Sequence, residues 1–194
     1  MFYIIALGNP GKEYDTTRHN VGWLMADALR AKFNFSEPIM SVKYLGRLSR
    51  GTIGEHEVTL LYPDTYMNNS GTAAAKLVPK EERSNIIVLQ DEIAIPIGTM
   101  KLSAGRGDGG HNGIRSLIGS LGTKDFARVR IGIAPTSFFT GKVKVVSGED
   151  LPKFVLGRFN KRELAELTAL EDKLAEAVRL IIAQGTAMAM NRFN

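Results

Sequence analysis

Two short apolar runs limit the folds open to this chain more than any other feature of its sequence. They are residues 2–8 (FYIIALG) and residues 85–90 (NIIVLQ), and neither alternates between apolar and polar positions. A strand with one face in water alternates, whereas a strand covered on both faces is a continuous apolar run. We therefore expect both runs to be buried strands of a sheet.

The rest of the pattern predicts further strands and several helices. The strands are expected at residues 43–50, 56–62, 98–104 and 127–133, with a hairpin between the first two. The helices are expected at about residues 20–33, after Ser70 as an N-cap, at residues 113–121, and from Asn160 to Gly185, with a short helical tail. Glu163 completes a capping box with Asn160, and residues 134–159 are expected to form a long loop with short ordered pieces. The sequence thus predicts a single α/β domain over residues 1–194, with three α/β/α layers and a twisted mixed sheet.

Composition excludes several classes of site. The chain has no cysteine, which rules out disulfides and thiolate ligands and suits a reducing compartment. Its three histidines are scattered and form no H-E-x-x-H pair, so we expect no metal. The first apolar run lacks a preceding basic segment, and no run reaches the roughly 20 apolar residues that span a bilayer. We expect a soluble, cytoplasmic protein with no membrane contact.

Positive charge is concentrated in one part of the chain. The formal net charge is +5, and residues 101–162 hold 12 Lys or Arg residues against 4 Asp or Glu residues. Such a segment is either a solvated basic face or a surface for a phosphate-rich partner such as nucleic acid. Composition alone leaves both interpretations open.

Polar side chains follow the ends of several predicted strands. They are Asn9, Asn68, Asp91, and the pair His111 and Asn112. If these strands share a direction, the side chains converge at one edge of the sheet, where open α/β sheets bind ligands. Each one alone is also an ordinary turn residue.

Two histidines are candidates for a general base. His19 and His111 each lie at the start of a predicted helix, whereas His56 lies in the predicted hairpin and is expected to be exposed. An imidazole with a pKa of about 6.5 is largely unprotonated at neutral pH, and a helix N-terminus disfavours its charged form. Spacing alone does not choose between His19 and His111.

Four motifs carry a resemblance to a known family. They are GNPGKEYDTTRHNVG (residues 8–22), PDTYMNNSG (63–71), QDEIAIPIG (90–98) and GDGGHNGIRSLI (107–118). In this order they resemble bacterial-type peptidyl-tRNA hydrolase, and the similarity continues through RVRIGI and FVLGRF. The resemblance implies a monomeric α/β enzyme, without metal or cofactor, that hydrolyses the ester between a peptide and the terminal ribose of tRNA.

The resemblance also implies roles for individual residues. His19 would be the general base, Asp91 would orient it and stabilise its charged form, and Asn9 would hold the peptide part of the substrate. Asn68 and Asn112 would bind substrate and position the water or the carbonyl group. Further cleft residues would be Tyr14, Tyr66, Met67 and His111. Candidates for contacts with tRNA phosphates are Lys101, Arg106, Arg128, Arg130, Lys142 and Lys144, although Ser103 stands where a second lysine is common in the family.

The glycine loop raises a rival interpretation. Residues 105–110 contain the spacing G-x-G-x-x-G, which is typical of a dinucleotide-binding turn. That fold needs an acidic residue about 20 residues later, whereas here the next strand ends in Ala134 and Pro135. We expect the glycines to allow a close approach of backbone to the cleft instead. A non-catalytic RNA-binding module and a nucleotide-dependent enzyme are the two alternatives to the hydrolase.

Overall fold

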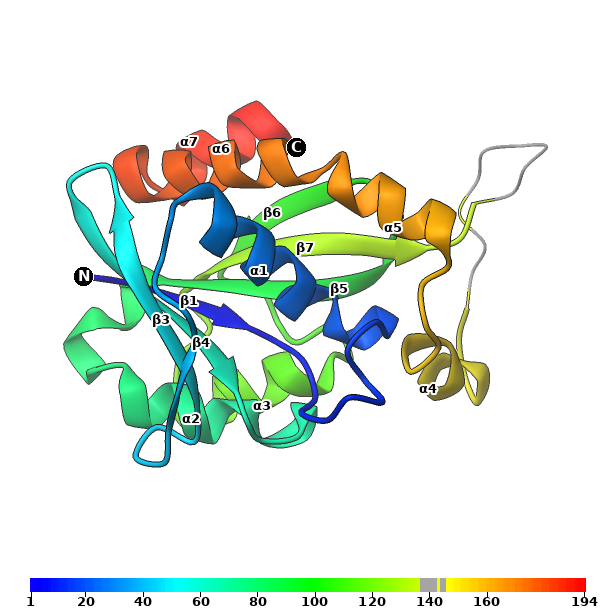
Figure 1. Ribbon diagram of the computed structural model, residues 1–194, viewed down its shortest axis with the longest axis horizontal. Coiled ribbons are helices and arrows are strands. Elements are labelled where there is room, and N and C mark those ends of the chain that lie inside the picture. The colour runs from blue at the N-terminus through cyan, green and yellow to red at the C-terminus, as the bar shows by residue number, and fades with distance from the viewer. Residues whose placement is uncertain (137–142, 144–145) are drawn as a thin grey trace.

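A seven-stranded sheet runs through the computed structural model, which describes residues 1–136, 143 and 146–194 (Figure 1). The strand order is β2-β3-β4-β1-β5-β7-β6. The strands are β1 (Phe2–Ala6), β2 (Ile39–Ser41), β3 (Gly46–Ile53), β4 (His56–Pro63), β5 (Ile86–Pro96), β6 (Met100–Ala104) and β7 (Ala127–Ala134). Neighbours among β4, β1, β5 and β7 are parallel, whereas β3 and β6 pair antiparallel with theirs. The predicted mixed sheet is confirmed.

Helices cover both faces of this sheet. They are α1 (Val21–Lys32), α2 (Ser70–Leu77), α3 (Asn112–Leu121), α4 (Asp150–Val155), α5 (Lys161–Thr168), α6 (Glu171–Gln184) and α7 (Thr186–Phe193), together with the short 3-10 helices η1 (Arg18–Asn20), η2 (Met67–Asn69) and η3 (Lys80–Asn85). One apolar cluster joins the sheet to α1, α5, α6 and α7, and a second joins its other face to α2 and α3 (Figure 1). The predicted three layers are therefore confirmed. In the described part of the chain, none of the helices combines the length and apolar character of a membrane span.

The first apolar run is buried on both faces, as predicted. Ile4 and Ala6 belong to the cluster beneath α1, whereas Tyr3, Ile5 and Leu7 belong to the cluster beneath α2 and α3. Successive strand residues point to opposite faces, so a run without alternation serves both clusters.

Two helix predictions need correction. The predicted helix from Asn160 to Gly185 is divided into α5 and α6, with a turn at residues 169–170. Its start is confirmed, because Asn160 and Glu163 form the expected reciprocal capping box. Ser70 is not an N-cap: it is the first residue of α2, and its hydroxyl donates a hydrogen bond to the carbonyl oxygen of Met67 in the preceding turn.

The glycines at residues 105–110 do not have the predicted role of allowing a close approach of backbone to the cleft. Because β6 runs antiparallel to β7, residues 105–111 must bring the chain back to the edge where the parallel strands end. A Cβ at Gly107, Gly109 or Gly110 would meet no described atom within 4 Å, so these glycines allow no close contact. Gly110 instead has a φ of +83°, a conformation that other residues rarely adopt. This glycine is needed for the turn.

Close backbone contact occurs at the start of α1 instead. A Cβ on Gly22 would lie 2.4 Å from the carbonyl oxygen of Leu7 and 2.7 Å from that of Leu89. Only glycine lets α1 rest directly on the backbone just after β1 and in the first half of β5. The turn before α1, which carries His19, is thereby held over the carboxyl edge of the sheet.

Candidate active site

A cleft of about 380 Å³ lies at the carboxyl edge of the parallel strands. It is lined by Asn9, His19, Tyr66, Met67, Asn68, Gln90, Asp91, Glu92, Ile93, Asp108, Gly109, Gly110, His111, Asn112, Leu151, Pro152, Val155 and Leu156. The polar residues come from the turn after β1, from η1, from the middle of β5, and from the segments that lead into α2 and α3. The last four residues come from α4 and its end, and they supply an apolar wall. The expected residues therefore converge, but not all at strand ends: β5 continues past Asp91 to Pro96, and the glycine loop returns the chain to this edge from antiparallel β6.

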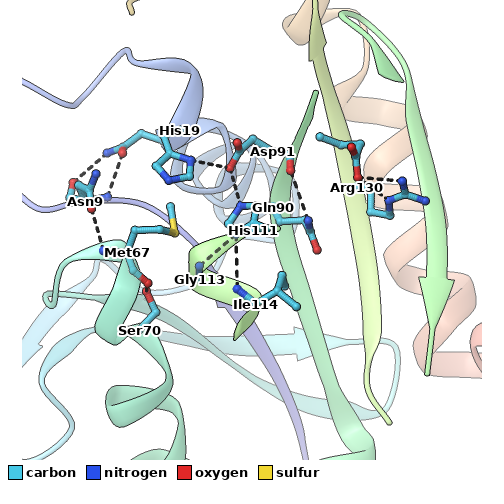
Figure 2. A network of polar contacts seen from close by, with 12 residues as sticks. Asn9, His19, Met67, Ser70, Gln90, Asp91, His111, Gly113, Ile114 and Arg130 are labelled. Atoms are coloured by element: carbon cyan, nitrogen blue, oxygen red, sulfur yellow. Dashed lines mark hydrogen bonds and ion pairs between the residues drawn. The ribbon is translucent and has the colours of Figure 1, made fainter. Parts of the chain in front are cut away.

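His19 and Asp91 form the centre of the polar network in Figure 2. Nδ1 of His19 lies 2.9 Å from Oδ1 of Asp91, which is buried. Burial acts to lower the pKa of His19, but the charge and hydrogen bond of Asp91 outweigh it and raise that pKa above its ordinary value. Burial likewise opposes ionisation of Asp91, yet His19 and His111 hold the pKa of that carboxyl well below its usual range. Asp91 is therefore a carboxylate that holds the Nδ1 proton of His19, leaving Nε2 as the basic atom.

His111 is engaged through both ring nitrogens. Its Nδ1 accepts hydrogen bonds from the backbone N–H groups of Gly113 (3.1 Å) and Ile114 (3.4 Å), and it thereby caps α3. Its Nε2 lies 2.8 Å from Oδ1 of Asp91 (Figure 2). An imidazole nitrogen that accepts carries no proton, so the proton is on Nε2 and the ring is neutral. No lone pair of His111 is left to take a proton, so the geometry favours His19 as the base.

Asn9 is held by a residue that the sequence did not single out. The Asn20 amide accepts from the backbone N–H of Asn9 and donates to its carbonyl oxygen, each at 2.9 Å. The side-chain oxygen of Asn9 accepts from the N–H of Met67 at 2.8 Å, which leaves the amide NH₂ group to face the cleft. Asn20 is fully buried. The sequence indicated Asn20 only by its position, directly after His19 and at the start of an apolar helix.

The same centre meets a distance criterion for metal binding. The potential ligand atoms of His19, Asp91 and His111 all lie within 4.8 Å of one another. However, each imidazole nitrogen that faces Asp91 carries a proton in this arrangement, and a metal ion would have to displace both. We interpret the group as an acid–base network.

A family model for peptidyl-tRNA hydrolase matches residues 3–194. The chain belongs to the peptidyl-tRNA hydrolase family. It is 38% identical to the peptidyl-tRNA hydrolase of Alkaliphilus oremlandii, with all of both chains covered. It is also 38% identical to that of Clostridium novyi, with 100% of this chain and 98% of the relative covered. The structure matches a crystal structure of the enzyme from Acinetobacter baumannii with a TM-score of 0.87 and 32% identity, covering 100% of this chain and 94% of the other. The predicted family, fold and enzyme class, a hydrolase acting on the ester of peptidyl-tRNA, are confirmed.

Most residues expected in the cleft of a peptidyl-tRNA hydrolase lie there. Tyr66, Asn68 and Asn112 line it with exposed side chains, and Met67 lines it from a buried position. Tyr14 is half-buried and lies outside the lining, in the turn that leads to His19. The apolar wall from α4 was not predicted, because a helix of six residues is too short for its apolar residues to show a helical period.

The expected basic residues that the structure describes lie on β6, in the glycine loop and on β7. Lys101 is exposed and is the cross-strand partner of Arg130, which forms an ion pair with Glu92 at 2.8 Å. Arg128 is buried, with 3% of its surface exposed, and donates to the carbonyl oxygens of Arg106 and Gly107. This position does not favour a direct phosphate contact by Arg128. Lys142 and Lys144 lie outside the described residues, and no Lys or Arg occurs in the described lining of the cleft.

Proposed function

We propose that this chain hydrolyses the ester of N-blocked peptidyl-tRNA with His19 as the general base, releasing a peptide and a free tRNA for reuse in translation. The observation that carries the proposal is a difference between the two histidines in the hydrogen bonds of their ring nitrogens. Asp91 accepts from both rings, but only His19 keeps an unprotonated nitrogen without a partner among the described residues. General base catalysis contributes roughly 10²- to 10⁴-fold to rate.

The reaction then follows from this geometry. Nε2 of His19 takes a proton from water while the water oxygen bonds to the carbonyl carbon of the ester. Asp91 stabilises the imidazolium that forms. When the tetrahedral intermediate collapses, the bond to the ribose oxygen breaks, and His19 returns its proton to that oxygen. The peptide leaves as a carboxylic acid and the tRNA leaves with a free hydroxyl group.

Amide side chains would bind the parts of the substrate that change charge. Asn68 and Asn112 lie exposed in the cleft, and the side-chain oxygen of Asn112 accepts from Arg115, which leaves its NH₂ group to donate. One donor to a developing oxyanion is worth about 10²- to 10³-fold. The fixed NH₂ group of Asn9 would bind the peptide part, in a position to distinguish an N-blocked peptide from a free amino acid.

The tRNA backbone would lie on the basic surface beside the cleft. Three carboxylates line the cleft, those of Asp91, Glu92 and Asp108, and they would repel phosphates. Exposed Lys101 and Arg106, with partly exposed Arg130, would bind the acceptor-stem phosphates outside it. Such contacts position a nucleic acid without reading its sequence. Only the terminal ester would enter the cleft.

The test is hydrolysis of N-acetyl-aminoacyl-tRNA by the purified chain and by His19→Ala. We expect the rate to fall at least about 10²-fold in His19→Ala, because no other described group can take its place. His56→Ala is the matched control, because His56 is exposed in the hairpin and outside the cleft. Near-normal turnover by His19→Ala would contradict its role as the base.

The same assay with EDTA tests the rest of the proposal. We propose a monomer that needs no metal or cofactor, so EDTA should leave the rate unchanged. Loss of activity in EDTA would contradict this part. A protein that binds tRNA without cleaving the ester would instead be an RNA-binding module.

A further inference from the structure

We propose that His111 is a positioning residue: α3 fixes its ring as the neutral Nε2–H tautomer, and its hydrogen bond to Asp91 limits how strongly that carboxylate holds the proton on His19. The inference rests on the proposed function, in which His19 is the base. It assigns His111 a share in setting the pH range of the reaction rather than a contact with the substrate.

The start of α3 determines the tautomer. The imidazole of His111 occupies the N-cap position, where Nδ1 faces the N–H groups of Gly113 and Ile114. A proton on Nδ1 would point at two donors, and a charged ring would face the positive end of the helix. The ring cannot easily turn away, because its side chain is only 9% exposed and rotation would break the hydrogen bonds at both ring nitrogens. The proton therefore sits on Nε2 and points at Asp91.

Both histidines donate to the same carboxylate oxygen. His111 Nε2 and His19 Nδ1 lie 2.8 Å and 2.9 Å from Oδ1 of Asp91, and the two rings are 5.3 Å apart (Figure 2). The hydrogen bond from His111 neutralises part of the charge on that oxygen. Because His19 becomes positive when it takes a proton, a partly neutralised Asp91 stabilises the charged form less. His19 is then the more readily unprotonated, and so more available as a base at neutral pH.

The other charged groups around His19 are already paired. On β5, Glu92 pairs with Arg130, and in the glycine loop Asp108 pairs with Arg115 and accepts from the N–H of Gly110. In η1, Arg18 pairs with Glu163 at 3.0 Å. The cleft residues contributed by α4 are apolar. The hydrogen bond from His111 is therefore the contact to Asp91 that a single substitution can remove without exposing an unpaired charge.

Two substitutions separate the donor from the cap. In His111→Asn, the side-chain oxygen can still cap α3, but no donor reaches Asp91. In His111→Gln, the amide nitrogen lies near the position of Nε2 and can still donate, while the cap is weakened. The readout is the titration of the His19 ring, followed by NMR in the intact chain, together with the pH dependence of kcat/KM.

We expect the midpoint of the His19 titration to move to higher pH by about 0.5–1 in His111→Asn, and to stay near that of the wild type in His111→Gln. The low-pH limb of kcat/KM should move in the same direction. An unmoved midpoint in a folded His111→Asn would overturn the proposal and leave His111 as a helix cap only. Equal shifts in both variants would also overturn it.

A measurement on the wild type needs no variant to fold. Ring ¹⁵N shifts at pH 8 should show His111 protonated at Nε2, and protonation at Nδ1 would contradict the proposal. These NMR readouts need no substrate. If His19→Ala kept its turnover, the proposed function would fail, while the coupling between His111 and His19 would still be tested directly.

Discussion

Asn20 shapes the site without entering the cleft. Its amide forms hydrogen bonds with the backbone N–H and carbonyl oxygen of Asn9. In a sheet, a neighbouring strand would supply these partners. With both main-chain groups of Asn9 satisfied, the side chain is free to bind Met67 on one side and to face the cleft on the other. The amide of Asn20 thus fixes the orientation of the Asn9 amide that lines the cleft, because unpaired polar groups in the interior are costly.

Replacing Asn20 should therefore destabilise the fold. We expect Asn20→Ala to lower the free energy of unfolding by about 1–3 kcal/mol, because two buried backbone groups lose their partners. Urea denaturation followed by circular dichroism measures the change. Asn191→Ala, at an exposed position in α7, is the control and should change stability by less than about 0.5 kcal/mol. Equal effects from the two substitutions would show that the Asn20 pair contributes nothing specific.

At the scale of elements, local pattern predicted most of the fold. The apolar runs, the capping box at Asn160 and the hairpin are signals read within a few residues, and each corresponds to an observed element. The break between α5 and α6 carries no glycine or proline, so the sequence offered no reason to divide the helix. Strand β2 has three residues and is largely exposed, which gives no period to detect.

The candidate site was predictable only in part. The predicted strand ends indicated that Asn9, Asn68 and Asp91 would meet, because β1, β4 and β5 are parallel. His111 reaches them by another route, since β6 is antiparallel and the glycine loop returns the chain to this edge. The choice between His19 and His111 depends on the hydrogen bonds of the His111 ring, whose Nδ1 caps α3. The spacing of residues along the sequence does not reveal such a contact. The burial of Arg128 could not be predicted either. Arginines alternate with apolar residues along its strand, which is the pattern of a strand with one exposed basic face.

Arg128 connects two elements, strand β7 and the glycine loop. Its guanidinium donates to the carbonyl oxygens of Arg106 and Gly107, which holds the glycine loop against β7. We expect Arg128→Met to lower the free energy of unfolding by about 1.5–3 kcal/mol, the range for hydrogen bonds to a charged group. Arg115→Met, on the exposed face of α3, should cost much less. If Arg128→Met instead weakened tRNA binding at unchanged stability, Arg128 would be a phosphate ligand.

The whole molecule separates its charges. Carboxylates and amides are among the groups that line the described cleft, whereas exposed cations lie on β6 and in the glycine loop. These two segments are linked to the cleft through the ion pair of Arg130 with Glu92 and through Asp108. A phosphate backbone bound on that surface would leave the reacting ester over His19. Such binding would keep phosphates away from His19, the proposed base, in a protein with a net charge of +5.

This separation predicts a salt-dependent contribution from Lys101. We expect Lys101→Ala to weaken tRNA binding to a similar degree for different tRNAs, and to reduce the slope of log affinity against log salt by about 1. Fluorescence anisotropy at several salt concentrations measures both. Lys173→Ala, on α6 against the other face of the sheet, should change neither. An unchanged salt slope in Lys101→Ala would place the tRNA elsewhere.

The pairing of His19 with Asp91 is the centre of the account, and the pH dependence of kcat/KM tests it most directly. The base must be unprotonated, and the Asp91 charge raises the pKa of His19, so activity should fall as pH drops through a midpoint above about 6.5. In Asp91→Asn the charge is gone, so the midpoint should move to lower pH and the limiting rate should fall by about 10²-fold or more. A midpoint that stays in place, with an undiminished rate in Asp91→Asn, would contradict the account.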